Sequence, residues 1–242
     1  MKIATLGCSH SSDYVGDSWP IFLSKELNAE LIQAYSIGAG NEINVEKLKY
    51  LLDLNPDLII VQLTDPGRLV LGLDSNLVKQ HVSIDDHGEA CHPHHFNGSY
   101  YYTFNPHDNN ENLRRMLKRT VSVDNFMLAG PITSDYNLYH KVLHTISTMA
   151  FMAQKKNTPI VFFSWSVNIH EIIKDQNYSE IFTDLDIIPS FIEEFVIEHS
   201  LRPIPHGEFG AGHHAPANQE IIAKKYILPF LKLTHRQLCT SG

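Results

Sequence analysis

The chain has 242 residues, a formal net charge of −8, and a composition that is 43% hydrophobic and 19% charged. This acidic balance argues against nucleic acid as a partner, because phosphate binding needs a local excess of Lys and Arg. The sequence contains no run of about 18 apolar residues and no apolar stretch near its start long enough for a signal-peptide core, so we expect a cytoplasmic protein that does not enter a membrane.

The cysteines give no sign of a disulfide framework. Cys8, Cys91 and Cys239 lie far apart and are odd in number, which favours a reducing compartment. Nothing in the sequence indicates a cofactor, and the sequence does not indicate the oligomeric state.

Short apolar runs alternate with helical patterns along the chain. Some of the expected helices carry capping residues or prolines at their starts. In chain order we expect a strand at 3–6, a helix capped by Ser18, a strand at 31–35, a helix capped by Asn41, a strand at 58–63, an irregular stretch at 72–133, a helix at 134–156, a strand at 160–165, a helix at 189–199, and a last helix after Pro216 that Pro229 should end or kink.

This alternation predicts βαβ units and hence a parallel sheet covered by helices on both faces. The fold class that follows is α/β, a three-layer αβα sandwich built as one domain over residues 1–242. The stretch 72–133 is rich in His, Asn, Asp, Gly and Tyr. A stretch that long inside a compact domain is usually functional or carries small elements of its own.

The first expected strand ends on Gly7-Cys8-Ser9-His10-Ser11. In an open parallel sheet, ligands bind beyond the carboxyl ends of the strands, and this segment leaves the first strand at that edge. A hydroxyl held there, near free N–H groups at a helix start, is well placed to act as a nucleophile, which makes Ser9 a candidate. The alternative is an ordinary βα loop in which a serine caps the helix.

Two further loops contain residues suited to acyl transfer. After the second strand, Gly38 and Gly40 allow close approach of backbone N–H groups to a ligand, and Asn41 could donate from its side chain, as in an oxyanion hole. A tight turn with a helix cap is the alternative there. Near the end of the chain, His213 and His214 lie in a glycine-rich loop before an amphipathic helix, where a histidine could serve as general base. A surface histidine pair is the alternative for this loop.

Taken together, these blocks resemble the SGNH, or GDSL-type, hydrolases along the whole chain. The first block of that family appears as Gly7-Cys8-Ser9, the second within 38–41, and the third as Gln62-Leu63-Thr64-Asp65. The last appears as 212–216 followed by a helix that contains Ile222-Ala223. The resemblance implies a flavodoxin-like sandwich and ester hydrolysis through an acyl-enzyme, with Ser9 as nucleophile.

The resemblance assigns the general base to His213, because the distance in sequence from His213 to Ala223 fits the family pattern. His214 is the second candidate for the base. It also implies oxyanion donors from the backbone of Ser9 and of Gly38 or Gly40, and from one side chain.

The sequence departs from the family pattern at three places. Cys8 replaces the Asp of the first block, and Thr64 replaces the Asn of the third, so that Thr64, Asn41 or Gln62 would have to donate to the oxyanion. The acidic partner of the histidine is missing, because Gly210 and Ala211 stand at its place. Either Glu208 takes that role, or a backbone carbonyl orients the imidazole in a Ser–His dyad.

Other residues are expected around the same site. Arg68 follows the third strand and either binds an anionic group of the substrate or pairs with Asp65, and Trp165 ends the fourth strand, where it could line the pocket. The segment 97–106, with its alternating aromatics, predicts a β-hairpin or a platform for stacking sugars. The cluster at 91–95 contains Cys and His residues that could bind zinc, but its spacing matches no standard site, so we expect no metal.

The function expected from these residues is hydrolysis of a small or carbohydrate-linked ester, such as an O-acetyl group. The alternatives are a degenerate relative that binds a glycan or metabolite without cleaving it, a metal-dependent hydrolase that uses residues 91–95, and a scaffold protein.

Overall fold

A computed structural model describes the backbone of most of the chain, namely residues 1–13, 15–35, 40–66, 68–73, 92–96, 99–104, 135–175, 178–180, 182–210 and 212–239. Its centre is a parallel sheet whose strands lie in the order β2-β1-β3-β7-β8. The strands are β1 (Lys2–Gly7), β2 (Glu30–Tyr35), β3 (Leu58–Leu63), β7 (Ile160–Ser164) and β8 (Asp186–Ile187). This is the flavodoxin-like order, so the predicted fold class is confirmed.

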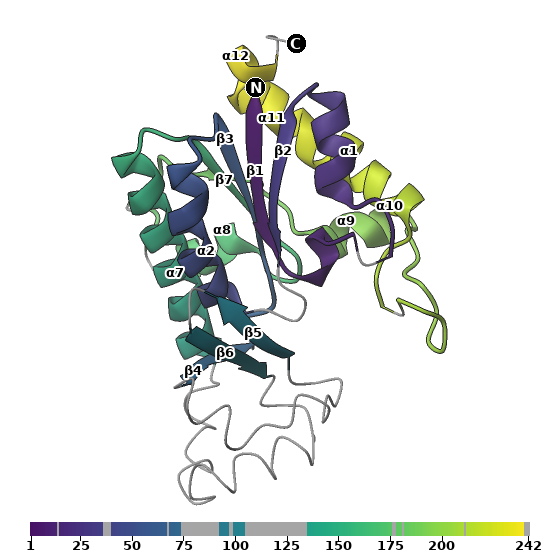
Figure 1. Ribbon diagram of the computed structural model, residues 1–242, viewed down its shortest axis with the longest axis horizontal. Coiled ribbons are helices and arrows are strands. Elements are labelled where there is room, and N and C mark those ends of the chain that lie inside the picture. The colour runs from purple at the N-terminus through teal and green to yellow at the C-terminus, as the bar shows by residue number, and fades with distance from the viewer. Residues whose placement is uncertain are drawn as a thin grey trace, which may run out of the picture.

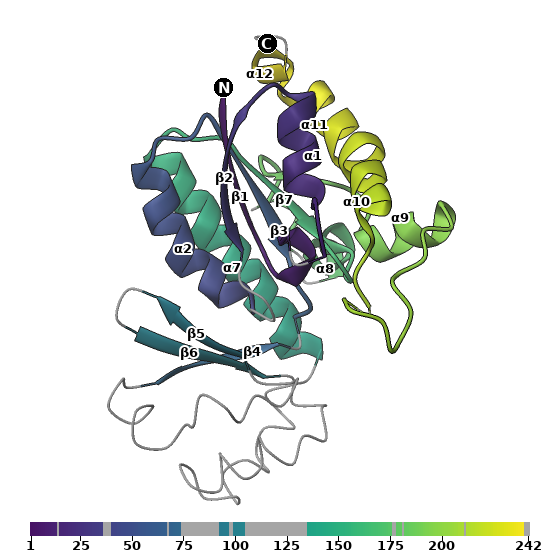
Figure 2. The same ribbon diagram turned by 45° about the vertical axis from the view of Figure 1, so that its right-hand side comes forward.

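Helices cover both faces of this sheet (Figure 1 and Figure 2). One face carries α2 (Asn41–Asp53), α7 (Asp135–Lys155) and α8 (Ile169–Asp175), and the other carries α1 (Trp19–Glu26) and α9 (Ile192–Glu198) together with the C-terminal helical segments. Alternate residues of β3 face opposite layers: Ile59 and Val61 pack with the first group of helices, and Leu58 and Ile60 with the second. The continuous apolar strands of the sequence are therefore buried on both sides.

The last helical region does not end at Pro229, which was one of the two outcomes expected for this residue. α10 (Pro216–Ile221) continues through a π-helical segment, η2 (Ile222–Ile227), into α11 (Leu228–Thr234), and α12 (Arg236–Cys239) follows. Pro229 stands in the first turn of α11. A proline removes one helical N–H and crowds the preceding turn, and the wider π segment just before it accommodates both effects.

Part of the predicted irregular stretch forms a second, antiparallel sheet. Its strands are β4 (Leu69–Leu73), β5 (His92–Phe96) and β6 (Ser99–Phe104), in the order β4-β6-β5. β5 and β6 form the hairpin expected around 97–106, with Phe96 opposite Ser99. The rest of 72–133 lies outside the described residues. None of the helices in the described ranges has the length and apolar character needed to cross a membrane.

Candidate active site

The loop that follows β1 is held in place by Ser11. This loop forms the short helix η1 (Ser9–Ser11). The Ser11 hydroxyl donates a hydrogen bond to Gln62 Oε1 and accepts one from Trp19 Nε1 at 3.1 Å. A Cβ at Gly7 would lie 2.1 Å from Ser11 Oγ, so only glycine leaves room for this arrangement. The glycine of the first block thus makes space for the residue that fixes the turn.

Ser9 keeps its hydroxyl available within this fixed turn. Its carbonyl accepts hydrogen bonds from the backbone N–H of Ser12 at 3.1 Å and from Ser12 Oγ at 2.6 Å. Its side chain is only 7% exposed, yet among the residues that the structure describes none shares a hydrogen bond with Ser9 Oγ. Among the described residues, the hydroxyls of Ser11 and Ser12 have protein partners and the hydroxyl of Ser9 has none.

The serine turn and the late histidine loop meet through their rings. His10, the residue after Ser9, stacks on Trp165 with ring centroids 3.7 Å apart and planes 16° from parallel. The ring centroid of His10 lies 4.8 Å from that of His213. The ring centroids of His214 and Trp165 lie 5.7 Å apart. Segments about 200 residues apart in the sequence therefore converge at the carboxyl edge of the sheet, where β1 and β7 end.

A backbone carbonyl faces the ring of His213. His213 Nδ1 lies 3.2 Å from the carbonyl oxygen of Gly210, one of the two residues at which the sequence resemblance left an acid missing. Gly210 has φ of +81°, and a Cβ there would lie 2.0 Å from Val15 Cγ1, so this backbone excludes a side chain. Glu208 is exposed, and none of the ion pairs among the described residues joins it to a histidine.

His214 is the more deeply buried histidine of the pair, at 4% exposure. Burial lowers its pKa, a hydrogen bond to the backbone of Arg202 partly opposes that effect, and the neighbouring His213 lowers the pKa further. Both imidazoles of the pair are thus oriented by main-chain groups, as the dyad alternative requires.

His10 is a site residue that our sequence reasoning missed. It is partly buried, and its pKa lies well below the ordinary value because of burial first and then of the positive charges that His213, Arg68 and His214 can carry. Its Nδ1 is buried and has no hydrogen-bond partner among the described residues. The signal that could have found it is its place next to the candidate nucleophile.

The predicted oxyanion donors have mixed outcomes. Gly38 lies outside the described residues, together with the rest of 36–39. Gly40 is the N-cap of α2, and Asn41, which we expected to be the cap, lies one residue further in. The Asn41 amide instead binds the end of β3, since Nδ2 donates to the carbonyl of Thr64 at 3.1 Å and Oδ1 accepts its N–H at 2.8 Å.

Both the oxygen and the nitrogen of the Gln62 side-chain amide have hydrogen-bond partners. It is completely buried, accepts from Ser11 Oγ and lies 3.2 Å from Cys8 Sγ through its Nε2. Its side chain ties β3 to the serine turn. Gln62 is therefore a support for the turn in this arrangement rather than a group that faces a ligand.

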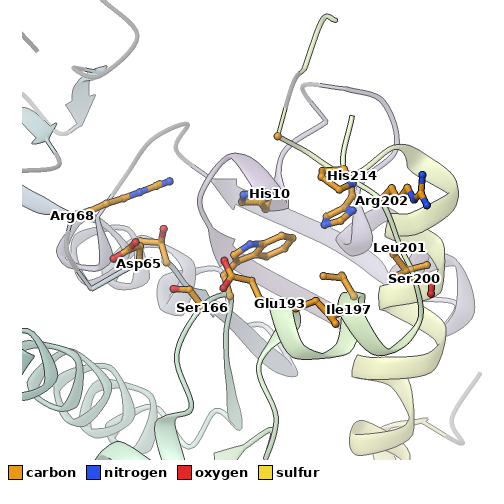
Figure 3. Close-up of a pocket in the computed structure, with 15 residues that line it drawn as sticks. His10, Asp65, Arg68, Ser166, Glu193, Ile197, Ser200, Leu201, Arg202 and His214 are labelled. Carbon is orange, nitrogen blue, oxygen red and sulfur yellow. The ribbon is translucent and has the colours of Figure 1, made fainter. Parts of the chain in front are cut away.

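A cavity of about 620 Å³ opens beside the histidines (Figure 3). Five predicted residues, Thr64, Asp65, Arg68, Trp165 and His214, line it, whereas Ser9 and His213 are not among the lining residues. Its volume is in the range of small-molecule sites. The lining consists of His10, Thr64, Asp65, Arg68, Trp165, Ser166, Glu193, Val196, Ile197, Ser200, Leu201, Arg202, Pro203, Gly212 and His214.

The predicted absence of metal at 91–95 stays untested, because Cys91 and the side chains of 92–95 lie outside what the structure describes. Within the described ranges, no three His, Cys, Asp or Glu side chains gather closely enough to hold a metal ion.

Comparisons with known proteins give a likeness in structure only. No protein-family model matches the sequence, and a search of curated proteins found no match. GDSL-type lipolytic proteins and esterases are among the structural neighbours.

Three solved structures illustrate this likeness. TesA has 15% sequence identity and a TM-score of 0.49, with 96% of this chain and 99% of that chain covered. A putative lipolytic protein of the G-D-S-L family from Desulfitobacterium hafniense DCB-2 has 11% identity and a TM-score of 0.46, with 95% and 99% covered. The psychrotrophic esterase EstA from Pseudoalteromonas sp. has 12% identity and a TM-score of 0.48, with 97% and 98% covered.

Proposed function

We propose that this chain is a serine ester hydrolase that acts on a small or carbohydrate-linked ester, such as an O-acetyl ester, through an acyl-enzyme. The observation that carries the proposal is the contact of His10 with His213, at a centroid distance of 4.8 Å. Because His10 is the neighbour of Ser9, this contact supports a position of Ser9 close to the histidine loop, and the Ser9 hydroxyl has no hydrogen-bond partner among the described residues.

In the proposed mechanism, Ser9 Oγ attacks the acyl carbon while His213 removes its proton. The Nδ1–H of His213 donates to the carbonyl of Gly210, which leaves the lone pair of the imidazole on Nε2 to act as base. The protonated imidazole then gives its proton to the departing alkoxide. A water molecule next cleaves the acyl-enzyme, so that its hydroxyl joins the acyl group and its proton returns to Ser9.

The developing oxyanion needs hydrogen-bond donors. We assign this role to the backbone N–H groups of Ser9 and Gly40 and to the side chain of Thr64, a residue that lines the cavity. Gly38 is a further candidate outside the described residues. A carbonyl in place of a carboxylate stabilises the imidazolium less, so we expect turnover up to about 10⁴-fold slower than with a complete triad.

Hydrolysis of p-nitrophenyl acetate by the wild type and by Ser9→Ala tests this proposal. We expect the wild type to turn the ester over and Ser9→Ala to lose at least about 10³-fold in kcat. Ser147→Ala is a matched control, because this serine only donates to a carbonyl within α7. Turnover that survives Ser9→Ala and is lost on chelation would favour a metal-dependent hydrolase, and no turnover at all would favour a binding protein or scaffold.

A further inference from the structure

Three aromatic rings from distant parts of the chain pack together beside the candidate base. His10, which follows β1, stacks on Trp165, which follows β7, with ring centroids 3.7 Å apart and planes 16° from parallel. The ring centroid of His10 also lies 4.8 Å from that of His213, and these two planes are inclined by 35°. The ring of His10 therefore contacts both the indole and the imidazole of the proposed base.

The contact between His10 and His213 is a packing of ring against ring. His10 Nδ1 is buried, and in the described part of the chain the ring of His10 takes part in no hydrogen bond. His213 Nδ1 lies instead 3.2 Å from the carbonyl oxygen of Gly210. The imidazole of His213 thus has a main-chain carbonyl at one nitrogen and an aromatic neighbour beside its ring.

The surroundings of His10 keep its ring uncharged. Burial lowers the pKa of His10 well below the ordinary value, and the positive charges that His213, Arg68 and His214 can carry lower it further. In the proposed reaction the proton of Ser9 goes to His213, so the imidazolium forms next to a neutral aromatic ring. An aromatic ring attracts a cation that lies within about 6 Å of its centroid.

We propose that His10, stacked on Trp165, is a positioning residue that stabilises the imidazolium of His213 through its ring. The inference rests on the proposed function and adds a residue to it. The proton passes from Ser9 Oγ to His213 and on to the leaving oxygen, and His10 neither gains nor loses one. The ring takes over part of the stabilisation that a carboxylate gives in a complete triad, and this part corresponds to about a two- to thirtyfold higher kcat.

Two replacements of His10 separate an aromatic contact from simple filling of space. His10→Phe keeps an aromatic ring, whereas His10→Leu puts an aliphatic side chain in its place. With p-nitrophenyl acetate we expect kcat within about threefold of the wild type for His10→Phe and about five- to thirtyfold lower for His10→Leu, with KM changed by less than about threefold in both. His199→Leu is the matched control, because His199 stacks on Phe195 with centroids 4.0 Å apart and does not line the cavity.

The pH profile of kcat/KM gives a readout that packing alone would not move. A ring that stabilises the imidazolium makes the base take up its proton at a higher pH. The acid limb of the profile should therefore lie about half a pH unit or more lower in His10→Leu than in the wild type, and His10→Phe should keep the limb of the wild type. Equal kcat values and equal acid limbs in the two variants would overturn the inference while the proposed function stands.

NMR titration of the histidine side chains tests the contact without turnover. The imidazole signal that His213→Gln removes should titrate at a lower pH in His10→Leu than in His10→Phe. If no ester is turned over but this difference is found, the hydrolase proposal fails and the ring contact remains. No turnover and no difference would overturn both.

Discussion

Gly210 shows how one residue decides which group can orient the base. Its carbonyl lies 3.2 Å from His213 Nδ1, and its positive φ and the nearby Val15 leave no space for a carboxylate. We predict that Gly210→Asp lowers stability by about 1–3 kcal/mol and does not raise kcat, because the new side chain is strained and cannot reach the imidazole. Thermal unfolding and ester turnover measure the two effects.

Gly207→Asp is the control for this prediction, because Gly207 also has a positive φ but nothing lies within 4 Å of a Cβ built on it. This variant should share the backbone strain and lack the clash with Val15. A faster Gly210→Asp enzyme would show that a carboxylate can take the orienting position.

The two histidines of the late loop should differ in their contributions. With His213 as base, His213→Gln should lower kcat by about 10³-fold or more, whereas His214→Gln should change kcat by less than about tenfold because His214 is expected to line the site without moving the proton. Steady-state kinetics with p-nitrophenyl acetate separates the two. The reverse order of effects would assign the base to His214.

At the scale of elements, the serine turn depends on the hydrogen bonds that join it to β3 and α1. We predict that Gln62→Leu destabilises the protein by about 1–3 kcal/mol, because the buried hydroxyl of Ser11 loses its acceptor, and that it slows ester turnover by loosening η1. Urea unfolding and kinetics check this. Gln154→Leu, an exposed change on α7, should do neither; an unchanged stability for Gln62→Leu would contradict this role.

The sequence predicted elements better than the partners of their polar side chains. The apolar runs at 31–35 and 58–63 mark β2 and β3 within one residue. β3 is buried along its whole length, and such burial imposes a continuous apolar pattern. Asn41 looked like a helix cap, but its amide binds the backbone of Thr64. Local sequence cannot reveal such a partner, since the pairing exists only once α2 and β3 are packed together.

At the scale of the whole molecule, the histidine cluster should make stability depend on pH. Burial lowers the pKa of His10 and His214 from the ordinary 6.5. Above that pH both are neutral in the folded and unfolded states, so they contribute nothing. Below it the unfolded chain binds protons that the folded chain does not, so stability should fall by up to about 1.4 kcal/mol per pH unit for each histidine until the folded pKa is reached.

Urea unfolding at pH 7.5 and pH 5.5 measures this loss in the wild type. His10→Phe keeps a ring against Trp165 and removes one titrating group, so it should lose less stability between the two pH values, whereas His144→Gln, an exposed change on α7, should behave as the wild type does. An equal loss in His10→Phe would contradict the role of His10.

Much of the candidate site followed from the order of motifs along the chain, because parallel strands bring their carboxyl ends to one edge. The stacking of His10 on Trp165 and the use of the Gly210 carbonyl did not follow. They depend on ring packing and on one left-handed backbone position, which no spacing rule for a catalytic motif contains.

The central claim is that Ser9 is the nucleophile of this site. Incubation of the intact protein with a fluorophosphonate probe, followed by mass spectrometry of its peptides, tests it most directly. We expect a single modified residue, Ser9, with labelling that Ser9→Ala abolishes and that His213→Gln slows. Modification of another serine, or no modification of a protein that turns esters over, would contradict the claim.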